Sequence, residues 1–147
     1  MKIVSACLCG INCAWNGKSK PSQKVIELMR SGEIIPVCPE QLGGLSTPRI
    51  PQEIQGCSGE DVLAGKGKIM NKNGEDVTIQ FIRGAEEALE IAKSAGATEF
   101  IAKSKSPSCG CGSTYDGTFS DTLIEGDGVT TALLKQNGIK VINSEDL

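Results

Sequence analysis

The chain has 147 residues, of which 39% are hydrophobic and 22% charged, a balance typical of one soluble globular domain. Its 15 basic and 18 acidic residues give a net charge of −3, which argues against bulk binding to DNA or RNA. No apolar run approaches the roughly 20 residues of a membrane-spanning helix. The first residues lack the pattern of a signal peptide, so we expect a cytoplasmic protein with no membrane association.

The first half of the chain predicts two strands around a helix. Residues 2–9 are apolar and β-branched, which predicts a buried strand, and residues 33–38 predict another. Between them, residues 21–32 carry apolar side chains at helical spacing. Residues 41–60, rich in Gly, Pro and Ser, predict a long functional loop, and a small β excursion follows over residues 61–78.

The second half continues the alternation of strand and helix. Residues 77–96 predict a long helix, 98–103 a strand, 128–138 a short helix and 139–145 a last strand. The predicted buried stripe of the long helix contains Ile79, Ile82, Ala85, Leu89 and Ala92. Alternating strands and helices indicate parallel βαβ units. We therefore expect an α/β fold, a three-layer Rossmann-like domain with a mainly parallel sheet, over residues 1–147.

Seven cysteines and the absence of histidine are the main anomalies of the composition. Without histidine, the chain lacks the usual general base and the commonest metal ligand. Any metal here would be bound by thiolates and oxygens, which points toward an iron–sulfur cluster or a cysteine-built zinc site.

Three cysteines follow three predicted strands. Cys7 and Cys38 lie at the carboxyl ends of the first and second strands, and Cys109 lies in the loop beyond the third. Open α/β sheets bind ligands outside the carboxyl ends of their strands. The three thiols are therefore expected to converge on one site.

Two other uses of cysteine remain open. A zinc-stabilised binding module usually presents cysteines in C-x2-C pairs, and a thioredoxin-type redox centre needs C-x-x-C; neither spacing occurs here. A thiol redox enzyme could still use Cys109 with Cys111. These alternatives stand beside the cluster hypothesis.

Four segments carry a resemblance to a known family. "SACLCGINCAWNG", "PVCPEQLGGLSTPR", "SKSPSCGCGSTYDGTF" and "GDGVTTALLKQNGI" occur in order along nearly the whole chain and together resemble the thiouracil desulfurase family. The resemblance implies an iron–sulfur-dependent desulfidase whose [4Fe–4S] cluster has three cysteine ligands and one open iron. Its expected reaction is non-redox hydrolysis that removes sulfur from a thiolated pyrimidine base or nucleotide, such as thiouracil or thiouridine monophosphate.

The resemblance also implies roles for individual residues. Cys7, Cys38 and Cys109 match the expected cluster ligands, and Cys13 also matches a family cysteine. Cys13 is thus either a competitor for a ligand place or a thiol that assists sulfur handling. Glu40, after "CP", matches the proton-transfer group, since no histidine is present for that work. The plainer interpretation of Glu40 is that it caps the N-terminus of a helix.

Four further polar residues complete the predicted site. Ser106 and Ser108 match the serines of the "SPS" motif, and Ser106 is preferred as the contact to substrate or water. Arg49 and Lys105 are candidates for binding a nucleotide phosphate, Arg49 because guanidinium groups bind phosphate in a bidentate manner. A solvated lysine, and an ion pair between Arg49 and Glu53, are the alternatives.

Overall fold

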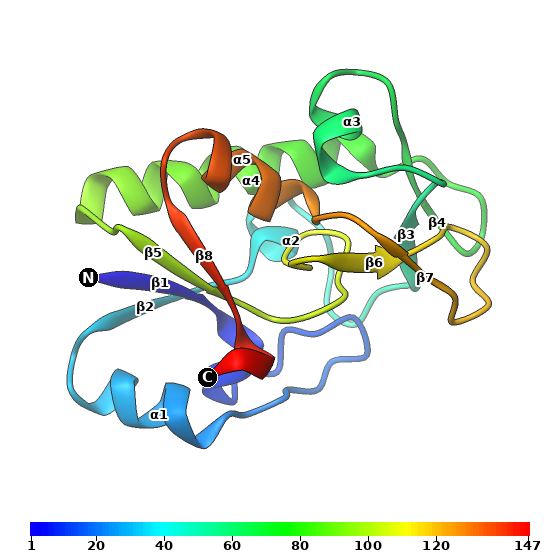
Figure 1. Cartoon of the computed structure of the whole chain (residues 1–147). Helices are drawn as coiled ribbons and strands as arrows, with labels where there is room; N and C mark the ends of the chain where they lie inside the picture. Colours follow the sequence, from blue (N-terminus) through cyan, green and yellow to red (C-terminus); the bar gives the residue numbers. More distant parts are fainter.

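The core of the protein is a four-stranded sheet in which every strand pair is parallel. The computed structural model covers all 147 residues. The strands are β1 (Lys2–Ser5), β2 (Ile34–Val37), β5 (Glu99–Ala102) and β8 (Lys140–Asn143), in the spatial order β2-β1-β5-β8. This confirms the predicted α/β fold with a parallel sheet. All four carboxyl ends consequently meet at one edge of the sheet (Figure 1).

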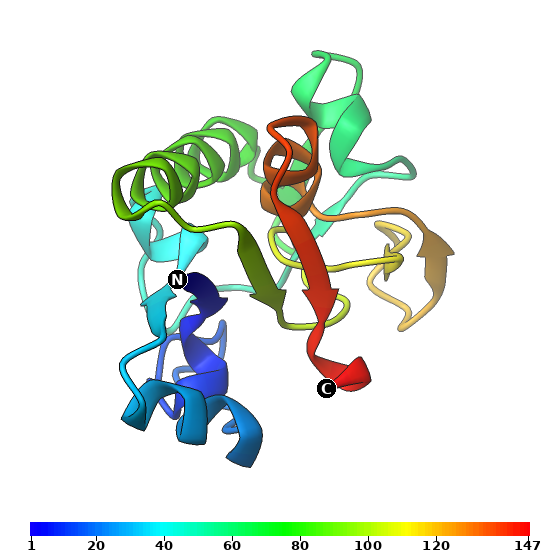
Figure 2. The same cartoon turned by 60° about the vertical axis from the view of Figure 1, so that its left-hand side comes forward.

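Helices cover both faces of this sheet. The helix α1 (Gln23–Arg30) lies below it in Figure 1, while α4 (Thr78–Ala95) and α5 (Val129–Gln136) lie above it, and the turned view agrees (Figure 2). Side chains alternate across β1, so that Ile3 packs on the side of α4 and α5 and Val4 on the side of α1. The sheet therefore has an apolar core on each face.

Shorter elements fill the connections. They are the 3₁₀ turn η1 (Ala6–Cys9), α2 (Pro39–Leu42), β3 (Gln52–Ile54), α3 (Gly59–Leu63), β4 (Ile69–Asn71), β6 (Ser113–Tyr115), β7 (Leu123–Glu125) and the 3₁₀ turn η2 (Ser144–Asp146). β3 pairs antiparallel with β4, and β6 with β7. A third apolar cluster fills the space between the β3–β4 pair, α3 and α4.

The first predicted strand is too long. β1 ends at Ser5, whose sheet partner Val37 is the last residue of β2, and the chain then turns through η1 to Gly10 at φ +87°. Cys7 and Cys9 therefore lie on a 3₁₀ turn. An apolar run cannot distinguish a buried strand from a buried turn, because both need only apolar residues.

The predicted loop over residues 41–60 contains regular structure that was missed. It includes β3 and the start of α3, and the β excursion predicted for 61–78 is the pairing of β4 with β3. These elements span only three to five residues each, too few for a periodic pattern to appear.

The predicted buried stripe of α4 is partly wrong. Ile79, in the first turn, is 68% exposed, and Phe81 is buried in its place. Apart from Phe81, the buried face is built from small residues, namely Gly84, Ala85, Ala88 and Ala92. Small side chains let neighbouring elements approach α4 closely, and hydrophobicity alone did not mark Gly84 or Ala88 as facing inward.

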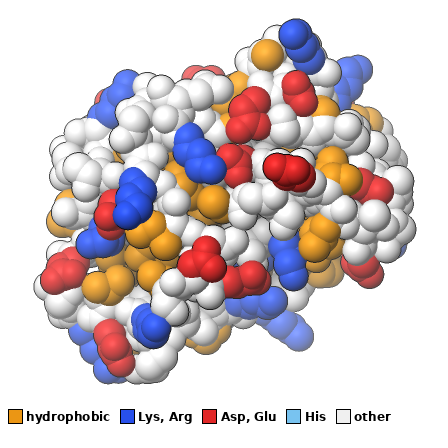
Figure 3. Space-filling view, in the orientation of Figure 1, with side chains coloured by type: hydrophobic (Ala, Val, Ile, Leu, Met, Phe, Trp, Pro, Cys, Tyr) orange, Lys and Arg blue, Asp and Glu red, His pale blue; other side chains and the backbone are white.

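The surface agrees with the small net charge. Basic and acidic side chains are interspersed over the face seen in Figure 3. No helix has both the length and the apolar character required to cross a membrane.

Candidate functional site

The three predicted ligand cysteines converge at the carboxyl edge of the sheet. Cys7 follows β1 on η1, Cys38 directly follows β2, and Cys109 lies in the loop after β5. All are free thiols; Cys7 and Cys109 are buried and Cys38 is half-buried. Cys7 interacts electrostatically with both Cys38 and Cys109, which places the three thiols in one region.

Burial dominates the ionisation of two of these thiols. It raises the pKa of Cys7 to about 11, although the positive charge of Lys103 acts in the opposite direction. Burial likewise raises the pKa of Cys109 to about 12, against hydrogen bonds with Ser5 and Ser108. Thiols in such surroundings stay protonated unless a bound cation stabilises the thiolate.

Cys38 differs from its neighbours because it is paired with Cys13. A hydrogen bond from the Cys13 thiol lowers the pKa of Cys38 to about 7 and raises the pKa of Cys13 well above its usual value. When Cys38 is protonated, its Sγ can donate instead to the Cys13 carbonyl oxygen, 3.7 Å away. Cys38 directly follows β2, and its assignment as a ligand in preference to Cys13 rests on this place at the end of a strand.

The loop of Cys109 is bound to the N-terminus of α5. The amides of residues 128–130 donate to the carbonyl oxygens of Gly110, Pro107 and Ser108 over 2.8–2.9 Å. A helix begins with unpaired amides, and here the loop residues 107–110, which we call the Cys109 loop, supply their acceptors. Gly128 is required for this approach, because a Cβ there would lie 2.5 Å from the Ser108 carbonyl oxygen.

A second close approach positions Cys38 and Glu40. Pro39 begins α2, and the backbone of α2 rests on α4 where Gly43 faces Gly84. A Cβ at Gly84 would overlap the Pro39 carbonyl oxygen. The small residues at these two positions therefore allow α2 to present Glu40 toward the Cys109 loop.

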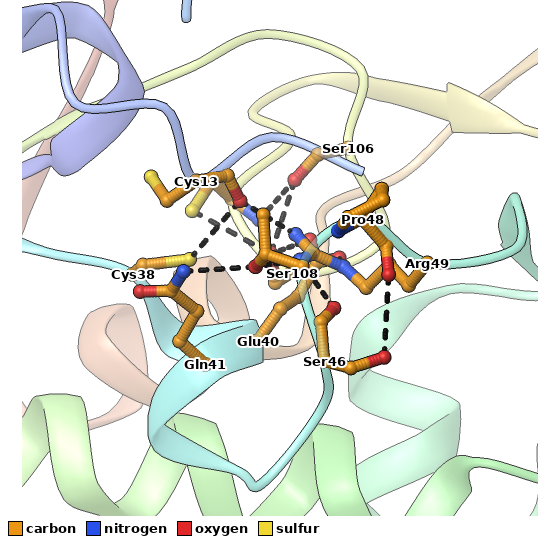
Figure 4. Close-up of polar contacts among 11 residues, drawn as sticks. Cys13, Cys38, Glu40, Gln41, Ser46, Pro48, Arg49, Ser106 and Ser108 are labelled. Carbon is orange, nitrogen blue, oxygen red and sulfur yellow. Dashed lines mark hydrogen bonds and ion pairs between the residues drawn. The ribbon is translucent and has the colours of Figure 1, made fainter. Parts of the chain in front are cut away.

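Glu40 joins two parts of the site through its carboxylate (Figure 4). Its Oε1 accepts from Arg49 Nε at 2.8 Å, and its Oε2 accepts from the Ser108 hydroxyl at 2.9 Å. The Ser106 and Ser108 hydroxyls are 3.2 Å apart, and Ser106 Oγ also accepts from the Cys109 amide at 2.7 Å. Glu40 thus has contacts beyond a helix cap, in a network that reaches the predicted ligand Cys109.

The structure brings together most, but not all, of the residues predicted for the site. Cys13, Glu40, Arg49, Ser106 and Ser108 form one network (Figure 4).

Lys105 is not part of this network, because its side chain makes no hydrogen bond or ion pair with the chain. The alternative pairing of Arg49 with Glu53 does not occur. Glu53 instead accepts hydrogen bonds from the amides of Gly117 and Phe119.

Sequence reasoning missed two residues that shape the site. Ser5, 3% exposed, ends β1, accepts a hydrogen bond from the Lys103 amide and hydrogen-bonds the Cys109 thiol. Thr131 donates its hydroxyl to the Cys109 carbonyl oxygen at 2.8 Å. Ser5 had a usable signal, a polar residue within the apolar run of residues 2–9, whereas Thr131 had none.

Comparisons with known proteins decide the family. A sequence model described as 2-thiouracil desulfurase matches residues 3–146. The chain belongs to the 2-thiouracil desulfurase family. It is 50% identical over 147 residues, 100% of this chain and 97% of the relative, to the uncharacterized protein YbbK of Bacillus subtilis (strain 168). A solved structure, the [4Fe–4S]-dependent thiouracil desulfidase TudS, superposes with a TM-score of 0.88 at 40% identity, over 99% of this chain and 91% of that one.

The donor set of this member of the family fits an iron–sulfur cluster. Iron–sulfur clusters are bound by cysteine thiolates, and three free thiols meet here without any histidine. No group of three or more Cys, Asp or Glu side chains is arranged to hold a metal ion. A tetrahedral zinc site would need that arrangement, with Zn–S distances of about 2.3 Å.

Proposed function

We propose that this protein is an iron–sulfur-dependent desulfidase that hydrolyses the thiocarbonyl group of thiolated pyrimidine bases or nucleotides. The overall reaction is C=S plus water giving C=O plus hydrogen sulfide, with no net oxidation or reduction. The observation that carries the proposal is the convergence of Cys7, Cys38 and Cys109 with the Glu40–Ser108 pair at one sheet edge. In our proposal, residues 1–147 form one desulfidase domain.

Cys7, Cys38 and Cys109 would bind the [4Fe–4S] cluster. Three protein ligands leave one iron open, and that iron would act as a Lewis acid toward the soft sulfur of the substrate. The surrounding residues keep the ligands in place: the Cys109 loop is bound to α5, and α2 is packed on α4. Cys7 and Cys109 are buried, which would keep bulk water away from two of the three ligands.

Glu40 would transfer the proton of the attacking water. Its carboxylate is the acidic group that contacts the Cys109 loop, and its side chain is only 12% exposed. Ser108 donates to Glu40 Oε2 and Ser106 lies next to Ser108, so the two hydroxyls can orient a water molecule beside this oxygen. Glu40 would take a proton from that water and return it to the departing sulfur.

Cys13 and Lys105 have accessory roles in this proposal. The Cys13 carbonyl oxygen lies 3.7 Å from Cys38 Sγ, so the Cys13 thiol would assist sulfur handling next to this ligand. Lys105 remains available for a nucleotide phosphate because its side chain has no partner in the chain.

The redox alternative is less well supported. It requires Cys109 and Cys111 as a working pair, but burial raises the pKa of Cys109 to about 12 and also raises that of Cys111. A thiol that attacks a disulfide must ionise near neutral pH. A zinc-stabilised module without catalysis is also less well supported, because this chain has no group of three or more Cys, Asp or Glu side chains arranged around one ion.

The decisive experiment combines metal analysis with a substrate panel. Protein purified and reconstituted without oxygen is expected to contain iron and acid-labile sulfide and to release hydrosulfide from 2-thiouracil or a thiouridine monophosphate. The matched oxygen-containing bases should give no hydrosulfide. Stoichiometric zinc without labile sulfide, or a fully loaded cluster that leaves every thiolated pyrimidine unchanged, would refute the proposal.

A further inference from the structure

Arg49 is buried inside the candidate site. Its side chain is only 5% exposed, although the arginine lies in the long connection between α2 and β3. A buried guanidinium needs partners for its positive charge and for its N–H groups. Figure 4 shows it beside Glu40, with Ser46 and Pro48 around the same turn.

The chain itself supplies nearly all the partners of this guanidinium. Nε donates to Glu40 Oε1 at 2.8 Å and NH2 to the Cys13 carbonyl oxygen at 2.9 Å. NH1 donates to the Ser46 carbonyl oxygen at 3.1 Å and to Thr47 Oγ1 at 3.0 Å. These contacts use four of the five N–H groups of an arginine and leave one. Bidentate binding of a phosphate would have to break existing contacts.

Arg49 binds two groups of the site: the carboxylate of Glu40, which is the proposed proton-transfer group, and the carbonyl of Cys13. With Oε1 bound to Arg49, the carboxylate of Glu40 can turn only Oε2 toward Ser108. The Cys13 carbonyl, also bound by Arg49, lies 3.7 Å from the Sγ of the predicted ligand Cys38. One guanidinium therefore links the proton-transfer group to the segment of Cys13.

We propose that Arg49 is a positioning residue that aims the Glu40 carboxylate, and that it does not bind the substrate phosphate. This inference rests on the proposed function and changes the role expected of Arg49 from the sequence. The role requires arginine, because the planar fork reaches Glu40 and the Cys13 carbonyl at once and a lysine ammonium presents no such fork.

The test compares a phosphate-free substrate with a phosphorylated one. In Arg49→Gln, the kcat for hydrosulfide release should fall about 100-fold for both 2-thiouracil and thiouridine monophosphate, since small misplacements of a catalytic group have effects of that size. KM should change little for either substrate. Glu40→Gln should lower kcat in the same way, and the double variant should be no worse than Glu40→Gln. The kcat of Arg49→Lys is expected to lie between that of Arg49→Gln and that of the wild type.

The matched control is Arg83→Gln, because Arg83 is exposed on α4 and its side chain has no ion pair or hydrogen bond with the chain. This control should retain wild-type kinetics. Iron and labile sulfide in Arg49→Gln should equal the wild-type values. A crystal structure of the anaerobic Arg49→Gln protein should show the Glu40 carboxylate moved away from Ser108.

Several results would overturn the inference. A loss confined to the phosphorylated substrate would make Arg49 a phosphate ligand. Loss of iron from both Arg49→Gln and Arg49→Lys would make it a support of the cluster instead. An unmoved Glu40 in the crystal structure would also refute it. If the wild type itself is inactive on all thiolated pyrimidines, the proposed function fails, and the crystal structure still decides whether Arg49 positions Glu40.

Discussion

Two loops at the same sheet edge are held in place by different means. The Cys109 loop receives four hydrogen bonds from the consecutive main-chain amides of residues 128–131, at the start of α5. Apart from the 3.7 Å contact of the Cys38 thiol with the Cys13 carbonyl, the segment around Cys13 is bound by one residue, Arg49. The Arg49 main-chain amide donates to the Trp15 carbonyl at 2.7 Å, and the Arg49 side chain donates to the Cys13 carbonyl at 2.9 Å.

The difference shows where each loop is vulnerable. Contacts made by a helix main chain survive most side-chain changes, because every residue except proline supplies an amide. Such contacts are sensitive to added volume at a glycine. Contacts made by one guanidinium are sensitive to its charge and shape. The Cys109 loop should therefore tolerate altered polar side chains, and the Cys13 segment should not.

The largest expected effect is a difference in cluster content between variants of Cys109 and of Cys13, one cysteine from each loop. Cys109→Ala should lose the cluster after anaerobic reconstitution, because a predicted ligand is removed. Cys13→Ala should keep iron and labile sulfide, because the three predicted ligands follow β1, β2 and β5 and Cys13 is not one of them. The measurement is iron and sulfide per chain together with cluster absorbance. A loaded cluster in Cys109→Ala, or its loss in Cys13→Ala, would reverse the assignment of ligands.

The second-largest effect is expected from Gly128→Ala, which adds volume where the Cys109 loop meets α5. Gly128→Ala places a Cβ 2.5 Å from the Ser108 carbonyl oxygen, which forces the loop and helix apart. We expect the free energy of unfolding to fall by about 3 kcal/mol, with a lower iron content. Urea unfolding under anaerobic conditions measures the first effect.

The control for Gly128→Ala is at the other end of the same helix. A Cβ at Gly138 meets no atom, but the backbone has φ +79°. Gly138→Ala should therefore cost about 1–2 kcal/mol, the usual strain of an alanine in the left-handed region, and should leave the iron content unchanged. Equal iron content in the two variants would mean that the contact of Gly128 does not position Cys109.

The sequence predicted the parallel sheet and the meeting of its cysteines because both depend on local patterns. Apolar runs mark β1, β2, β5 and β8, and connectivity then places their carboxyl ends together. The predicted ligands follow three of those ends. The meeting of the strand ends follows from the order of strands and helices alone, so the incorrect length of the first strand did not affect this prediction.

The polar network was less accessible from the sequence. Glu40 and Ser108 are 68 residues apart, and only the close contact of α2 with α4 brings Glu40 to the Cys109 loop. Glycines at 43, 84 and 128 create these contacts, but a glycine in a sequence does not indicate which backbone it will approach. The bidentate chemistry of Arg49 suggested a phosphate ligand. It did not indicate that the guanidinium would bind Glu40 and the Cys13 carbonyl of the chain itself.

The smallest expected effect tests the tolerance of the Cys109 loop directly. Thr131 donates its hydroxyl to the Cys109 carbonyl, and Thr131→Val keeps the shape of the side chain while it removes this hydrogen bond. A buried carbonyl without its partner should lower the free energy of unfolding by about 1–2 kcal/mol. Iron content and turnover should stay close to wild type, because the amides of residues 128–130 still bind the loop. If Thr131→Val instead lost its iron, one side chain would hold the Cys109 loop as well, and the contrast with the Cys13 segment would disappear.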